Sequence, residues 1–88
     1  MSRVIHKFLL EFGESRIEMP EFAKPLHVGE QNGLLYLWAA VDQADEKQKY
    51  RVRVIGTGHV LPVDLRLHQY VGTVQMLDGL VWHVFVDS

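Results

Sequence analysis

Apolar and polar residues alternate along most of this chain in short runs, which glycine, proline or charged residues interrupt. Residues 4–12 show the pattern first, because His6, Phe8, Leu10 and Phe12 fall on one face of an extended chain. A spacing of two with aromatic and aliphatic residues on one side predicts a β-strand.

A turn and a second strand are predicted next. Gly13-Glu14-Ser15 has the composition of a turn. Residues 16–19 alternate charged with apolar side chains, which predicts a short strand with one side in water. Residues 21–24 lie between two prolines and are too few for a helix, so we expect a connector there.

Two hairpins are predicted from Xaa-Gly turns. Asn32-Gly33 separates residues 26–31 from residues 34–41, and both turn residues tolerate the positive φ angles of a type I′ turn. Residues 34–41 are apolar on both faces, which favours a central strand over an edge strand. The second hairpin joins two further strands, at residues 70–77 and 80–87, through Asp78-Gly79.

Residues 49–55 alternate cleanly and predict a strand that leads into a long connection. Within that connection, residues 63–67 fit either a short strand or one turn of helix. Long connections in compact domains are often functional. With no long segment of helical period, the chain is predicted to be all-β, a single domain over residues 1–88. We expect a small antiparallel sandwich or barrel of six or seven strands with little or no helix.

The composition restricts the function classes. The chain has 88 residues, no cysteine and a net charge of −2. The missing cysteine excludes disulfides, thiolate catalysis and Cys-based zinc sites, and the net charge argues against nucleic-acid binding. No apolar run approaches the ~20 residues that span a bilayer, and the first residues do not resemble a signal peptide, so we expect a soluble cytosolic protein. Because a domain this small buries only ~60% of its unfolded surface, we also expect a homo-oligomer.

A basic stripe is the first candidate site. Lys47, Lys49, Arg51 and Arg53 are spaced by two and therefore project from one face of a strand. One interpretation is a solvated face matched to acidic residues on neighbouring strands, or a charged edge that prevents aggregation. The other is an anion site, in which Arg51 and Arg53 bind phosphate or carboxylate.

The basic stripe leads directly into Gly56-Thr57-Gly58-His59. Two glycines allow backbone amides to turn towards an anion, and Thr57 and His59 would add polar contacts. The alternative is a bulge or turn in which glycine supplies positive φ. The predicted ligand site therefore consists of Arg51, Arg53, Gly56, Thr57, Gly58 and His59. A surface aromatic residue on the same face would complete a nucleotide site by stacking.

Metal and catalytic sites are not predicted. His59, Asp64 and His68 are the nearest approach to a metal set, and their spacing matches no standard ligand pattern. Thr57 near His59 is the one hydroxyl–base pairing close in sequence, and no nucleophile-elbow motif is present. We expect neither an enzyme nor a bound cofactor.

Five ordered motifs lie along the chain, at residues 17–20, 37–42, 55–59, 70–75 and 82–85. Together they resemble a family of small uncharacterised proteins encoded by tailed bacteriophages. The similarity covers about residues 4–86, and its most distinctive parts are the Gly-Thr-Gly-His segment and the closing His-Val-Phe. Family members usually carry Pro-Ile-Pro-Asp after the first motif, where this chain has Val60-Leu61-Pro62-Val63-Asp64, which leaves the shape of this loop open.

The resemblance implies a setting but no activity. Small phage proteins often inhibit host systems, so we expect a non-enzymatic binding protein in the host cytoplasm that counteracts a host defence. Its partner would be a small anionic, nucleotide-like ligand or a host protein that it masks. The alternative is a structural or assembly protein that self-associates through strand edges. A small enzyme that uses His59 is a third hypothesis.

Overall fold

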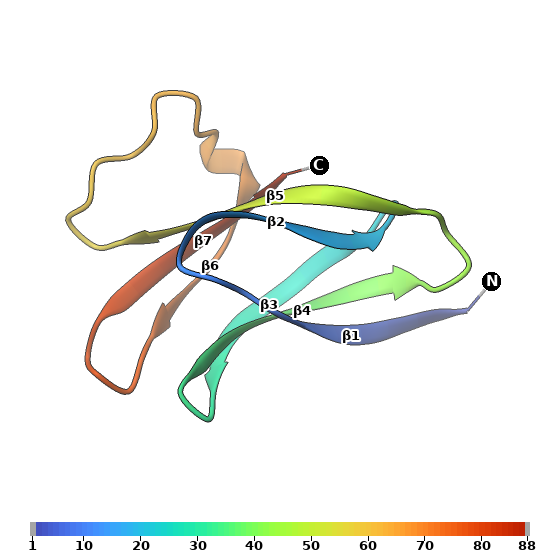
Figure 1. Cartoon of the computed structure of the whole chain (residues 1–88), viewed down its shortest axis with the longest axis horizontal. Coiled ribbons are helices and arrows are strands. Elements are labelled where there is room, and N and C mark those ends of the chain that lie inside the picture. The colour runs from blue at the N-terminus through green and yellow to red at the C-terminus, as the bar shows by residue number, and fades with distance from the viewer. Residues whose placement is uncertain (1, 88) are drawn as a thin grey trace.

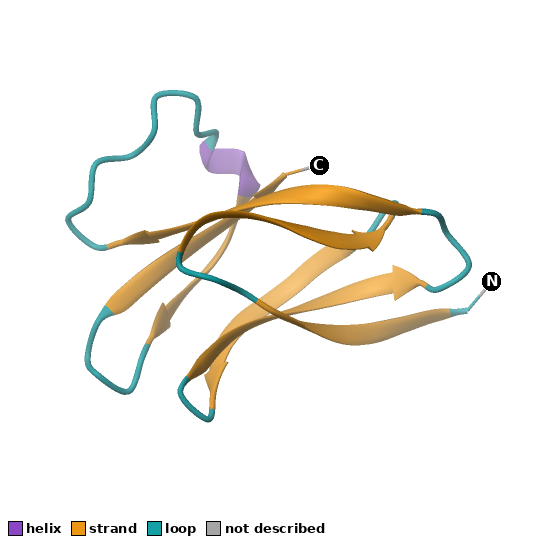
Figure 2. Cartoon of the chain, in the orientation of Figure 1, coloured by secondary structure: helices purple, strands orange, loops and turns teal. Residues whose placement is uncertain are grey.

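The computed structural model describes residues 2–87 and confirms the all-β prediction (Figures 1 and 2). A single short 3-10 helix, η1, precedes β6, and within the described residues no helix is long and apolar enough to cross a membrane. The elements are β1 (Arg3–Leu9), β2 (Gly13–Pro20), β3 (Lys24–Gln31), β4 (Leu34–Asp42), β5 (Lys47–Gly56), η1 (Leu67–Gln69), β6 (Tyr70–Gln75) and β7 (Val81–Asp87).

The seven strands form two antiparallel sheets, of order β1-β4-β3 and β2-β5-β7-β6. The chain passes from one sheet to the other at the β1–β2, β2–β3 and β4–β5 connections. The two sheets remain separate and pack as a sandwich, not as a closed barrel (Figure 1). β3 lies beside β6 along one side of the sandwich. The close approach there depends on Gly72, since a Cβ at this position would lie 2.8 Å from Cγ2 of Val28.

The core lies between the two sheets and is built largely from alternate residues of the strands. β4 contributes Leu35, Leu37, Ala39 and Val41, all at most 1% exposed. Each fully buried aliphatic side chain of this size stabilises the fold by roughly 1.5–3 kcal/mol relative to an exposed one. From the other sheet the main contributors are Met19, Tyr50, Val52, Val54, Val74 and Val84.

Both predicted hairpin turns are present. Asn32 and Gly33 have φ angles of 54° and 81°, as a type I′ turn requires. The Gly33 amide also donates to the Glu30 carboxylate at 2.6 Å. In the second hairpin, Gly79 has a φ of 86°, and the residue before it accepts a hydrogen bond from the Leu80 amide.

Two local predictions are wrong. Residues 13–15, predicted as a turn, begin β2, because the chain crosses between the sheets earlier, at residues 10–12. Gly13 supplies a φ of 85° at that entry, and Glu14 then pairs with Arg53 of β5. Residues 63–67 form neither a strand nor a turn of α-helix, since Pro62 and Leu65 close a tight turn by a backbone hydrogen bond of 3.0 Å. The only helical turn of this connection, η1, begins at Leu67.

Candidate functional site

The basic stripe lies on the face of β5 that points away from the other sheet, as predicted. Its members alternate with the buried Tyr50, Val52 and Val54. In the register with β2, Arg53 stands opposite Glu14 and Lys49 opposite Glu18. Arg16 stands opposite Arg51, which is a like-charge pair that further carboxylates must offset.

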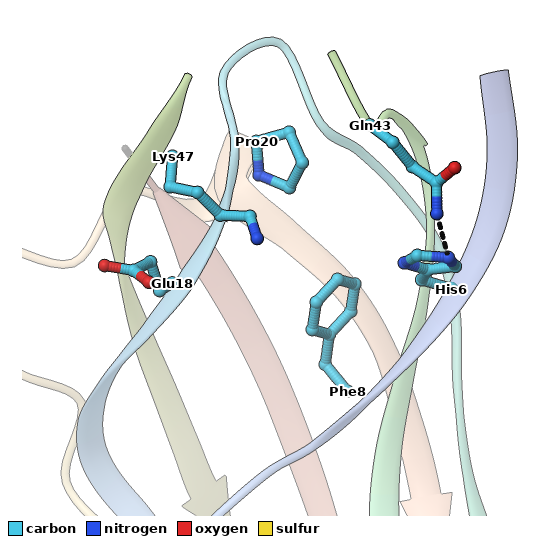
Figure 3. A pocket seen from close by; sticks show the side chains of 6 residues that line it. All are labelled: His6, Phe8, Glu18, Pro20, Gln43 and Lys47. Carbon is cyan, nitrogen blue, oxygen red and sulfur yellow. Dashed lines mark hydrogen bonds between the residues drawn. The ribbon is translucent and has the colours of Figure 1, made fainter. Parts of the chain in front are cut away.

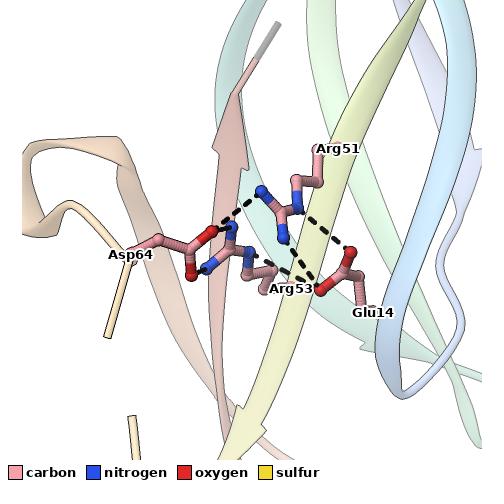
Figure 4. A network of polar contacts seen from close by, with 4 residues as sticks. All are labelled: Glu14, Arg51, Arg53 and Asp64. Carbon is pink, nitrogen blue, oxygen red and sulfur yellow. Dashed lines mark hydrogen bonds and ion pairs between the residues drawn. The ribbon is translucent and has the colours of Figure 1, made fainter. Parts of the chain in front are cut away.

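Two carboxylates neutralise the arginines of the stripe (Figure 4). Asp64 lies in the connection between β5 and β6. Its carboxylate accepts hydrogen bonds from both terminal nitrogens of Arg53, each at 2.9 Å. It also accepts from Arg51 Nη1 at 3.1 Å. Glu14 lies on the opposite side of the cluster and binds Arg51 at 3.1 Å and 3.3 Å. Arg53 is only 5% exposed although it lies on an outer face, so its charge depends on these partners.

The ion pairs shift the pKa values of the partners in the expected directions. Hydrogen bonding by Arg53 lowers the pKa of Asp64 from 3.8 to about 2, and the charges of both arginines act in the same direction. Hydrogen bonding by Arg51 lowers the pKa of Glu14, and Glu14 in turn raises the pKa of Arg51. Both carboxylates are therefore ionised at neutral pH, and each arginine is already bound to an anion of the chain itself.

A second polar cluster joins the two ends of the same connection. The hydroxyl of Thr57 lies 2.8 Å from Nε2 of His83, and the hydroxyl of Thr73 lies 2.9 Å from Nδ1 of the same ring. Tyr70 continues the chain through a hydrogen bond of 2.5 Å with Thr73. Because Thr57 begins the connection and Tyr70 follows it, this chain of hydrogen bonds holds the two ends together across β7.

The Gly-Thr-Gly-His segment does not act as one unit. His59 turns away from Thr57 and packs against Trp82 in an edge-to-face arrangement, with the ring centroids 5.8 Å apart. Its ring covers Gly56, where a Cβ would lie 2.8 Å from the imidazole. The hydroxyl–base pairing suggested by sequence proximity is therefore replaced by the pairing of Thr57 with His83. Gly58 has a φ of 89°. It therefore supplies the positive φ angle of a turn, which was the alternative to an anion-binding loop.

Two cavities are candidate ligand sites. One of about 320 Å³ is lined by Thr57, His59 and Trp82 together with the turn of the second hairpin. Another, of about 140 Å³, lies between β1, β2 and the β4–β5 turn (Figure 3). There His6 hydrogen-bonds to Gln43 at 3.1 Å, and Phe8 forms an apolar wall. This second cavity is smaller than the ~300 Å³ that small-molecule sites usually occupy.

Residues 57–69, called the connecting loop below, expose aliphatic side chains. Val60 is 93% exposed, Val63 is fully exposed, and Leu61 and Leu67 are also exposed. Within residues 2–87, positions 60–68 make side-chain hydrogen bonds to residues outside the loop through Asp64, and the Leu67 carbonyl accepts a hydrogen bond from the backbone amide of Tyr70. The loop is thus tied at its beginning by Thr57, in its middle by Asp64, and at its end by the bond between Leu67 and Tyr70.

The predicted site residues fall into two groups. Arg51 and Arg53 meet in the ionic cluster. Thr57 and His59 lie outside this cluster, since Thr57 hydrogen-bonds to His83 and His59 packs against Trp82. The structure adds Glu14, Asp64 and His83, which sequence reasoning did not place at the site. Asp64 had a detectable signal, because it is the sole acidic residue between Gly56 and Tyr70. Further residues sharing the outer face of this sheet are Tyr70, Thr73 and Phe85.

No three His, Asp or Glu side chains gather as a metal site in the part of the chain that the structure describes.

A family described as a domain of unknown function, DUF7352, matches residues 1–88. The chain belongs to the DUF7352 family. No curated protein and no solved structure matches it. Membership in DUF7352 agrees with the expected uncharacterised family, whereas a phage origin stays a prediction.

Proposed function

We propose that this protein is a non-enzymatic binding protein that recognises another protein through the connecting loop. The observation that carries the proposal is the exposure of Val60, Leu61, Val63 and Leu67 on one loop tied down by ion pairs. Single exposed aliphatic residues are ordinary, but several together on a soluble protein are typical of an interaction site.

Burial of these side chains in a partner would supply the binding free energy. Each aliphatic side chain that moves from water into an apolar pocket contributes roughly 1.5–3 kcal/mol. Val60 and Val63 are almost unburied in the free protein, so most of this contribution is still available to a complex. A partner with an apolar, concave surface fits this chemistry.

The ties of the loop support the same proposal. A loop that is ordered before binding loses less conformational entropy in the complex. Asp64 fixes the middle of the loop on Arg51 and Arg53, and the hydrogen bond between Thr57 and His83 fixes its beginning. The polar clusters then position the recognition element and do not themselves contact the ligand.

The biological role in this proposal follows from the sequence resemblance to small tailed-phage proteins. The partner would be a protein of the bacterial host, masked in the host cytoplasm so that a defence system fails. This role is separable from the binding mode, because a loop that binds a protein would be equally suited to a partner outside any defence system.

The test is capture from a bacterial host extract with the double variant Val60→Ser/Val63→Ser. A matched control is Leu77→Ser/Leu80→Ser, which removes two exposed leucines at the turn of the second hairpin. We expect a protein that the wild type and the control retain and that the loop variant loses. A set of captured proteins that is the same for all three would contradict the proposal. Circular dichroism establishes that each variant is folded.

A small anionic ligand is the second candidate function. It is favoured by the two-pronged contact between Arg53 and Asp64, because phosphate presents the same acceptor geometry as a carboxylate. The ligand would displace Asp64 and release the connecting loop. Tyr70, which is exposed on the same face, would offer an aromatic surface for a base.

Competition with Asp64 gives this second candidate a distinctive test. Binding of ATP and of inorganic phosphate is measured by calorimetry for the wild type, Asp64→Asn and Arg51→Gln. If the anion site exists, Asp64→Asn strengthens binding because it removes the internal competitor, and Arg51→Gln weakens it. Absence of binding to the wild type and to Asp64→Asn alike would exclude these anions and leave the protein-binding proposal standing.

A further inference from the structure

β1 presents an unpaired edge of the three-stranded sheet. It pairs with β4 on one side and, within residues 2–87, with no strand on the other. The amide of Leu10 donates to the carbonyl of Leu35 at 2.9 Å, directly beyond the pair Leu9–Tyr36. In an antiparallel ladder this alternation turns the backbone of every second residue outward. The outward N–H and C=O groups therefore belong to Arg3, Ile5, Lys7 and Leu9.

The other three sheet edges carry features that discourage pairing. β2 alternates Glu14, Arg16 and Glu18 along its length and ends at Pro20. β3 contains Pro25 and an irregularity after it, β6 has an irregularity between its first residues, and these two strands lie beside each other. Prolines, bulges and alternating charges are the usual protections of an edge strand. β1 has no proline and pairs regularly with β4 over its whole length.

β1 exposes two large aliphatic side chains beside the charged Arg3 and Lys7. Ile5 is 62% exposed and Leu9 is 54% exposed, both on the face away from the core. On the other face, Val4 and Phe8 are partly buried against the core. A long and regular edge that exposes aliphatic side chains can pair with another strand.

We propose that β1 pairs with β1 of a second copy of this chain, antiparallel around a two-fold axis. The two three-stranded sheets then become one continuous sheet, and the outward N–H and C=O groups of each copy satisfy those of the other. Interfaces of this kind are isologous, since the same strand lies on both sides. The small size of the domain adds to the gain from further burial.

The charges of β1 select one register. With His6 on the axis, Ile5 faces Lys7 of the second copy and Arg3 faces Leu9. A shift by one pair in one direction places Lys7 opposite Lys7, and a shift in the other direction places Arg3 opposite Lys7. Both shifts juxtapose like charges, which destabilises a cross-strand pair. Registers displaced by a single residue would turn the apolar side chains to the wrong face.

This dimer does not depend on the proposed function. The connecting loop begins at β5 and ends at β6, and both strands belong to the other sheet. The dimer is therefore tested with variants of β1, and partner capture is tested with variants of the connecting loop. One proposal can be contradicted while the other is supported.

Charge exchange across the axis tests the register. Light scattering coupled to size exclusion is expected to give twice the 10.2 kDa of one chain for the wild type. Ile5→Lys places like charges opposite each other and is expected to restore the single-chain mass. The double variant Ile5→Lys/Lys7→Glu places opposite charges there and is expected to form the dimer again. A wild-type mass of one chain at every concentration, or a dimer unaffected by Ile5→Lys, would overturn the proposal.

A cysteine crosslink provides a second test, because the chain contains no cysteine. The two copies of His6 would form a pair without mutual backbone hydrogen bonds, where the Cα atoms lie about 4.5 Å apart, which a disulfide can bridge. His6→Cys is therefore expected to form a covalent dimer on mild oxidation, whereas Lys24→Cys, exposed on β3, is not. Equal crosslinking of both variants, or of neither, would contradict this interface. Circular dichroism establishes that the variants are folded.

Discussion

Arg53 and Asp64 form a two-pronged ion pair in which both terminal nitrogens of the arginine lie 2.9 Å from the carboxylate. The arginine is buried, whereas the carboxylate is more than half exposed and comes from the middle of the connecting loop. This pair therefore does two things at once. It satisfies a charge that the sheet would otherwise leave buried and unpaired. It also holds a loop in which, among the described residues, positions 60–63 make no hydrogen bond to the sheets.

Replacement of Asp64 by Asn is expected to loosen the connecting loop without unfolding the sandwich. The amide keeps one acceptor but loses the charge that attracts Arg51 and Arg53. Hydrogen exchange measured by mass spectrometry should become faster in residues 58–68 and stay unchanged in β4. Asp45→Asn is the control, because this aspartate makes no side-chain hydrogen bond or ion pair among the described residues. Exchange that is unchanged in the loop of Asp64→Asn would show that other contacts hold it.

Acid is expected to remove the same tie. The pKa of Asp64 is about 2 in the folded protein against an ordinary value of 3.8, so the unfolded chain binds the proton more tightly. Its contribution to stability is complete above about pH 5, declines as the pH falls from about 4 to about 2, and is lost below that. The free energy of unfolding, measured in urea between pH 5 and pH 2, should therefore fall more steeply for the wild type than for Asp64→Asn. Equal slopes would mean that the carboxylate is not held by the arginines.

The core prediction compares two leucines of β4. Leu37 is fully buried and Leu34 is 49% exposed, so the same change to alanine has different consequences. Leu37→Ala is expected to lower the free energy of unfolding by about 2–5 kcal/mol through lost burial and a residual cavity. Leu34→Ala should cost less than about 1 kcal/mol, because surface changes are small. Urea denaturation of both variants measures the difference, and equal costs would show that Leu37 does not lie in the core.

Much of the fold could be predicted because the periodicity of two and the Asn32-Gly33 turn are local signals. The common face of Arg51 and Arg53 followed from the same periodicity. The partners of these arginines could not be predicted, because Asp64 reaches them through a loop whose path depends on tertiary contacts. For the same reason, proximity in sequence suggested His59 as the partner of Thr57, whereas the sheet register brings His83 there.

The turn predicted at residues 13–15 shows a different limit. A cluster of glycine, glutamate and serine has turn composition, yet Glu14 lies in β2 and pairs with Arg53 of β5. A charged residue on the outer face of a strand is as polar as one in a turn, so composition alone does not separate them. The chain crosses between the sheets instead at residues 10–12, where Leu10 is buried and Phe12 packs against Trp82. Because these residues are apolar, their composition did not predict a turn.

The contact between β3 and β6 gives the final prediction. A Cβ at Gly72 would lie 2.8 Å from Cγ2 of Val28, which is buried and has a stiff, branched side chain. Gly72→Ala is therefore expected to lower the free energy of unfolding by about 1–3 kcal/mol through overpacking. If this contact is the cause, the double variant Gly72→Ala/Val28→Ala should lose less stability than the two single variants added together, because the smaller side chain makes room. Additive costs in urea denaturation would mean that β3 and β6 do not pack through this pair.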